Sequence, residues 1–153
     1  MPDPESRLAA LGIVLPTPGR PVANYIPFVR TGDMVHISGQ VSVAADGGIR
    51  GVVGDDLDLA AGQAAARLCA INLIAQMKLA CEDDLRRLKR VVKLGGFVQC
   101  ASHFTDLPQV INGCSDLMVD VFGDQGRHAR SSVGVYRLPM GYAVEIDAVI
   151  EAP

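Results

Sequence analysis

Apolar side chains along residues 59–81 recur with the period of an α-helix. They are spaced at i, i+4, i+7, i+11 and i+15, which places them on one face of a single long helix. A helix with such a stripe is typical of an element that packs on a sheet or on another helix. The positions predicted to form this face are Ala64, Leu68, Ile71, Ala75 and Leu79.

A second helix is predicted from Asp106 to Gly123. Asp106 followed three residues later by Gln109 resembles a capping box, and Pro108 suits a first helical turn. Gly123 is a typical residue for ending a helix. The apolar positions at helical spacing, which are expected to face a sheet, are Val110, Cys114, Leu117 and Val121.

Shorter segments rich in β-branched residues predict the strands. Residues 25–29 and 34–38 flank a glycine-containing turn, so they predict a β-hairpin. A short strand is predicted at 49–53 and a longer one at 88–100. The pair Gly95-Gly96 inside the longer strand indicates a bulge or a close approach of the backbone to another element.

The C-terminal part of the chain predicts two more strands, at 132–138 and 143–150, joined by a turn into a second hairpin. The last strand alternates strictly, so it has one apolar face and one largely acidic face that includes Glu145 and Asp147. Its apolar positions are Val144, Ile146, Ala148 and Ile150.

This order of elements predicts an α+β domain. Runs of strands combined with two long helices favour a mixed β-sheet with both helices packed on one face. Residues 1–22 contain five prolines, which disfavour continuous helix or strand. They therefore predict an N-terminal arm, with a short helix at 6–11, docked on a single domain at 23–153.

Composition narrows the classes of function. The 153 residues carry a formal net charge of −3, so long-range attraction to nucleic acid is not expected. No apolar run approaches the ~20 residues of a membrane-spanning helix and no export signal is recognised, which predicts a soluble cytoplasmic protein. The four cysteines form no C-x-x-C pair and the three histidines lack ligand spacing. Free thiols, and neither a metal nor a cofactor, are therefore expected.

Three short segments near the C-terminal end carry a family resemblance. They are Ala129-Arg130-Ser131 at the start of a strand, Leu138-Pro139 in a turn, and Val144-Glu145-Ile146-Asp147 in the last strand. In this order and spacing they resemble the RidA/YjgF family of imine deaminases, also called endoribonuclease L-PSP. Matching positions upstream are Tyr25, Ser38-Gly39-Gln40, Asn72 and Arg90-Val91-Val92-Lys93.

The resemblance implies a chorismate-mutase-like fold, assembled as a homotrimer with a site in each cleft between subunits. It also implies hydrolysis of reactive enamines or imines, such as 2-aminoacrylate, to a keto acid and ammonia. Arg130 would hold the substrate carboxylate with its planar charged fork, and Glu145 would orient or deprotonate the attacking water. Backbone groups near Ser132 would anchor the substrate, and Tyr25 would close one wall.

One position departs from the family pattern. The resemblance implies an asparagine on the second helix that touches substrate, but Asn112 is off register by about one turn and Ser115 takes the better-aligned place. The preferred substrate therefore stays open. Asn112 and His128 are second-rank candidates, since the loop before His128 can equally hold that side chain in solvent.

Simpler interpretations of the same residues stay open. Arg130 can be a surface ion-pair partner, Glu145 the polar side of an alternating strand, and Tyr25 a packing residue. Two other functions also stay open, an endoribonuclease that inhibits translation and a non-catalytic trimer that binds a small carboxylate. The acidic composition with 5% aromatic residues argues against the endoribonuclease.

Overall fold

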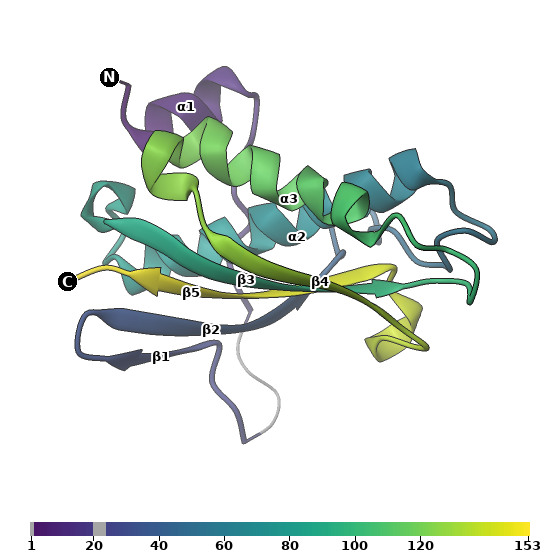
Figure 1. Cartoon of the computed structure of the whole chain (residues 1–153). Coiled ribbons are helices and arrows are strands. Elements are labelled where there is room, and N and C mark those ends of the chain that lie inside the picture. The colour runs from purple at the N-terminus through teal and green to yellow at the C-terminus, as the bar shows by residue number, and fades with distance from the viewer. Residues whose placement is uncertain (1, 20–23) are drawn as a thin grey trace.

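Five strands form one mixed β-sheet, and the helices lie along one of its faces (Figure 1). The computed structural model describes residues 2–19 and 24–153. The predicted α+β architecture, with two long helices on one face of a mixed sheet, is confirmed. The strands are β1 Phe28–Thr31, β2 Met34–Val41, β3 Arg90–Gln99, β4 Ala129–Val135 and β5 Val144–Glu151. The helices are α1 Pro4–Ala10, α2 Leu59–Ala80 and α3 Leu107–Phe122.

The order of strands across the sheet is β1-β2-β5-β3-β4, so β4 lies at an edge. β4 pairs in parallel with β3, and α3 supplies the crossover that a parallel pair requires. α2 packs over β2 and β5, while α3 packs over β3 and β4. The hairpin of 25–29 with 34–38 is confirmed as β1 and β2, although β1 begins only at Phe28.

The second predicted hairpin, 132–138 with 143–150, is wrong. β5 pairs antiparallel with β2 on one side and with β3 on the other. Alternate residues of β5 are fully buried, as suits a central strand, whereas β4 alternates between half-buried and exposed positions. The turn between β4 and β5 reverses the chain but does not make these two strands neighbours. The apolar face of β5 is buried when β5 lies between β2 and β3.

α2 has the predicted length but a different buried face. Asp58 caps it by accepting a 2.8 Å hydrogen bond from the N–H of Ala61. Of the predicted stripe, Ala75 is buried and Ile71 packs partly buried against the core, whereas Ala64 is exposed and Leu79 is 44% exposed. The helix is rich in alanine and apolar nearly all round, so its periodicity fits more than one face. The residues that face the core include Ala65, Ala66, Cys69, Leu73, Ile74 and Met77.

α3 buries the predicted stripe, and Gly123 ends it with a φ of 63°. The capping box is wrong, because Asp106 makes no side-chain cap hydrogen bond in the described part of the chain. Its backbone ψ of 46° leaves the extended conformation that capping side chains usually adopt. Pro108 lies in the first turn, as predicted.

At Gly95-Gly96 the backbone of β3 closely approaches neighbouring side chains, which is one of the two predicted alternatives. A Cβ on Gly96 would lie 2.7 Å from Cδ1 of Ile111 on α3. A Cβ on Gly95 would collide with the Asp147 carboxylate on the other face. The register shift in this strand lies elsewhere, between Val91 and Lys93.

The segment 49–53 does not form the predicted strand. It makes only isolated bridges, such as Arg50 with Tyr142 and Val53 with Cys100. Its glycine at position 51 has a φ of 131°, which interrupts an extended run.

The N-terminal segment docks on the helix side through α1, which starts two residues before the predicted helix. Leu8 is buried at 4% exposure, and Glu5 accepts a 3.0 Å hydrogen bond from the N–H of Leu85. The predicted boundary between arm and domain falls at residues 22–23, which lie outside the described residues. Within residues 2–19 and 24–153, no helix is both long and apolar enough to cross a membrane.

Candidate functional site

Arg130 points from the edge strand toward α3. It pairs with Leu94 of β3, whose side chain is buried under the helices. Its Nη1 donates hydrogen bonds to Asn112 Oδ1 at 2.8 Å and to Ser115 Oγ at 3.0 Å. Among the residues with described positions, Arg130 forms no ion pair. Its partners are neutral, so its positive charge remains available to an anion, and Nη2 and Nε are not occupied by these two bonds.

His128 extends this hydrogen-bond network. Its Nδ1 lies 2.6 Å from the carbonyl oxygen of Gly126, and its Nε2 lies 2.8 Å from Ser115 Oγ. A carbonyl oxygen can only accept, so Nδ1 carries the proton. In the neutral ring Nε2 is then an acceptor, and the Ser115 hydroxyl donates to it. Burial, and to a lesser degree the charge of Arg130, lower the pKa of His128, which favours this neutral form.

These side chains line a small surface pocket of about 270 Å³. Asn112, a second-rank candidate from the sequence, lies directly against Arg130. Asn112 and Ser115 are three residues apart and therefore share one face of α3, a spacing that could have indicated their proximity. The sequence interpretation did not select Asp116, Val119 and Arg127. The lining residues are Asn112, Ser115, Asp116, Val119, Arg127, His128 and Arg130.

Ser132 is on the same side of β4 as Arg130, because alternate residues of a strand point the same way. Its Oγ is buried and has no hydrogen-bond partner among the described residues. The hydroxyl lies beside Gly96 of β3, its neighbour in the parallel register. The predicted contact between this region and a substrate therefore depends on backbone groups or on a small rotation of the hydroxyl.

Glu145 points to the opposite side of the sheet from Arg130. It lies between Val144 and Ile146 on β5, whose side chains are buried under the helices. Because neighbouring residues of a strand point to opposite faces, the Glu145 side chain projects from the other face of the sheet. Gly39 of β2 makes room for it, since a Cβ there would lie 2.6 Å from Glu145 Oε1. A register shift between Ile37 and Gln40 brings Gly39 to this place.

The carboxyl groups on this open face have perturbed acidity. Burial raises the pKa of Glu145, and the neighbouring charge of Asp147 raises it further. Burial also raises the pKa of Asp147, partly offset by a hydrogen bond from the Gly95 backbone and by Lys93. A carboxyl group that holds its proton more tightly than usual is a better base when ionised, which suits acid–base chemistry.

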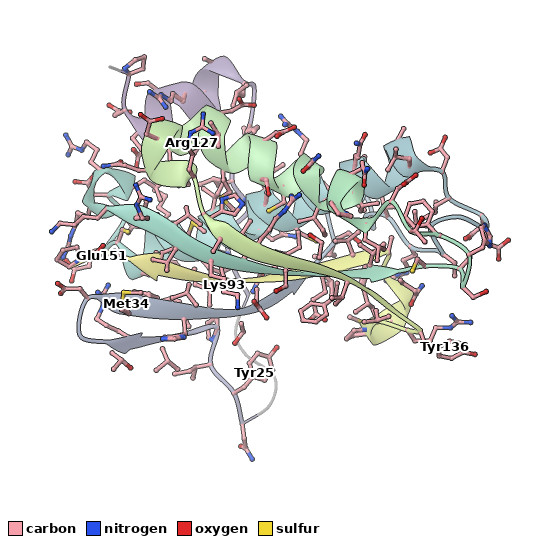
Figure 2. All side chains as sticks on the ribbon, in the orientation of Figure 1. Tyr25, Met34, Lys93, Arg127, Tyr136 and Glu151 are labelled. Atoms are coloured by element: carbon pink, nitrogen blue, oxygen red, sulfur yellow. The ribbon has the colours of Figure 1, made fainter. Side chains whose placement is uncertain are left out.

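Tyr25 lies far from the pocket around Arg130. It is 55% exposed, and Figure 2 shows it beyond one side of the sheet while Arg127, which lines the pocket, lies on the helix side. One chain thus brings together Arg130, Asn112, Ser115 and His128. Within the same chain, Glu145 and Tyr25 are separated from them by the sheet.

Residues 5–144 match the family described as YjgF/chorismate mutase-like, putative endoribonuclease. The chain belongs to this family. Protein TCP17 of Trypanosoma cruzi is 47% identical over 148 residues, which cover 95% of this chain and 92% of the relative. A 2-iminobutanoate/2-iminopropanoate deaminase of Dermatophagoides farinae is 27% identical over 140 residues, 90% of this chain and 93% of the relative.

A crystal structure with the same fold comes from a protein of unknown function from Agrobacterium tumefaciens. The two structures agree with a TM-score of 0.92, and their sequences are 44% identical. The matched region covers 98% of this chain and 92% of the Agrobacterium chain. The resemblance inferred from Ala129-Arg130-Ser131 and the following segments is confirmed, together with the YjgF/chorismate mutase-like fold.

Proposed function

We propose that the protein hydrolyses reactive enamine or imine intermediates that carry a carboxylate, giving a keto acid and ammonia. The observation that carries this proposal is the state of Arg130. Its guanidinium is held by an amide oxygen and a hydroxyl at the wall of an open pocket, and it forms no ion pair with a described carboxylate. A planar cation fixed in this way fits a small carboxylate in two-point contact.

Glu145 is assigned to the attacking water. A carboxylate that is half buried, with its pKa raised, can accept a proton from water as oxygen adds to the imine carbon. It returns that proton as the carbinolamine collapses and ammonia leaves. Tyr25 is assigned to one wall of the same cleft, and backbone groups near Ser132 to binding of the substrate.

A homotrimer would reconcile these roles with the opposite orientations of Arg130 and Glu145. Because the two side chains project from opposite faces of the sheet, a shared site requires two chains. β4 is the edge strand, so the Arg130 pocket lies at the rim of the sheet, where a neighbouring subunit can reach it. A closed ring of identical subunits repeats such a heterologous contact at every interface. In that arrangement Glu145 and Tyr25 of one subunit would complete the pocket of the next.

The test is the rate of pyruvate release from 2-aminoacrylate that a second enzyme generates in the same cuvette. The wild-type protein should exceed the spontaneous rate, and Arg130→Lys should lower kcat/KM roughly 100-fold, because an ammonium cannot form the two-point contact. Arg86→Lys is the matched control, since Arg86 forms an exposed ion pair with Asp84. A wild-type rate no higher than the spontaneous one, or an Arg130→Lys variant as fast as wild type, would refute the proposal.

A further inference from the structure

Ser115 and His128 form a pair within one chain that imine hydrolysis does not require. The hydroxyl donates to Nε2 across 2.8 Å, and the carbonyl oxygen of Gly126 accepts from Nδ1 across 2.6 Å. A hydroxyl bonded to a base that is itself oriented by a third group is the arrangement of an activated serine nucleophile. All of these contacts come from α3 and the segment just before β4, so they need no second chain.

We propose that Ser115 is a nucleophile activated by His128, and that this pocket hydrolyses short-chain acyl esters through an acyl-serine intermediate. This activity goes beyond the proposed imine hydrolysis. The two share the pocket, Arg130 and the hydrogen bond from Arg130 to Ser115. Ser115 and His128 both line the pocket, so an acyl group can approach the hydroxyl. The volume of about 270 Å³ admits a small ester.

Arg130 gives the hydroxyl an electrostatic advantage. Its Nη1 lies 3.0 Å from Ser115 Oγ, so the positive charge stabilises the developing alkoxide. A hydroxyl oxygen has two lone pairs, and the bond from Arg130 uses one and leaves the other for attack. Asn112 accepts from Arg130 through Oδ1, which leaves its amide N–H groups as further donors in the pocket.

The reaction balances with water as the second reactant. Ser115 Oγ forms a bond to the ester carbonyl carbon while its proton moves to Nε2 of His128, and the resulting oxyanion lies next to Arg130. The C–O bond to the alcohol breaks as the alkoxide takes the proton from His128. Water then adds to the acyl-serine, gives a proton to His128, and the carboxylic acid leaves as that proton returns to Ser115.

Two measurements on the full-length protein test the proposal, a mass spectrum after treatment with a fluorophosphonate and the rate of 4-nitrophenyl acetate hydrolysis. We expect one phosphonyl adduct per chain on the peptide that contains Ser115, with loss of fluoride. Ser115→Ala should abolish the adduct and lower hydrolysis roughly 100-fold, as loss of a nucleophile does. His128→Gln should lower both the labelling rate and hydrolysis.

The controls are Ser131→Ala and His103→Gln, which change an exposed serine and an exposed histidine outside the pocket. Both should hydrolyse the ester like wild type. Ser115→Cys guards against a variant that fails to fold, because a cysteine at this position keeps a nucleophile that the ester acylates. An adduct on another residue, or Ser115→Ala hydrolysis equal to wild type, would overturn the proposal. Neither readout involves 2-aminoacrylate, so this proposal and the imine deaminase can fail separately.

Discussion

At the scale of single residues, Glu145 combines solvent access with an unfavourable setting for its charge. Its pKa is raised by burial and by the nearby Asp147, and its carboxyl group makes no hydrogen bond or ion pair with the described residues. A residue placed in this way contributes little to stability when ionised, and such positions are often functional. The same physical cause leads to a prediction about stability.

Glu145→Gln should increase the free energy of unfolding near pH 8 and have little effect near about pH 4. The folded protein holds the Glu145 proton more tightly than the unfolded chain does, whose ordinary pKa is 4.5. Stability from this group is therefore fully present below 4.5 and declines as the pH rises through the folded-state pKa. Solvent screens a carboxylate that is partly exposed, so the gain should be only about 0.5 kcal/mol or less.

The measurement is urea unfolding of wild type and Glu145→Gln at both pH values. Glu151→Gln, the same change on the same face of β5, is the control for the effect of replacing a carboxylate by an amide. A variant that is less stable than wild type near pH 8, or that is equally stabilised at both pH values, would contradict this account of Glu145.

At the scale of elements, the contact between α2 and α3 depends on glycine. A Cβ on Gly113 of α3 would collide with the backbone carbonyl of Gln63 on α2. Backbone cannot move aside as a flexible side chain can, so the two helices would have to separate. This close approach holds α3 near β3 and β4, where Asn112 and Ser115 contact Arg130.

Gly113→Ala should therefore destabilise the protein by about 2–3 kcal/mol, although alanine favours helix more than glycine does. Gly19→Ala is the control, because no heavy atom lies within 4 Å of a Cβ built there and the residue is exposed. Thermal unfolding of both variants measures the difference. Equal midpoints for Gly113→Ala and wild type would show that the helices are not packed this closely.

The sequence predicts the extent of the helices well and their orientation less well. α2 was predicted at 59–81 and runs from Leu59 to Ala80. Its buried face was misassigned because alanine is small and apolar, so several faces of the helix satisfy the same period. In α3 larger residues alternate with polar ones, and the predicted stripe is buried. Local pattern therefore determines a face only where side chains differ clearly in polarity.

The candidate site could be predicted only in part. The strand segment around Arg130 and the acidic face of β5 follow from motif and alternation. The relative positions of Arg130 and Glu145 do not follow from the sequence, because they depend on β5 lying between β2 and β3 rather than pairing with β4. The bond from Ser115 to His128 also escaped prediction, since it joins a helix to the segment before β4 and has no fixed spacing in the sequence.

At the scale of the whole molecule, the sheet separates the two halves of the proposed imine site. The helix side has the Arg130 pocket, and the open side has Glu145 and Asp147. The open side also has exposed apolar groups, among them Val133 at 43% exposure. A trimer formed through this open side would bury such groups and bring Glu145 of one subunit to Arg130 of another.

Mixing two inactive variants tests this central claim most directly. Arg130→Ala and Glu145→Gln chains are unfolded together in equal amounts, refolded, and assayed for pyruvate release from 2-aminoacrylate. If each site takes Arg130 from one subunit and Glu145 from its neighbour, about a quarter of the sites are intact, and about a quarter of the wild-type activity should return. Each variant refolded alone should remain inactive. No recovery in the mixture, with wild-type protein regaining full activity after the same treatment, would show that the two residues do not act across a subunit boundary.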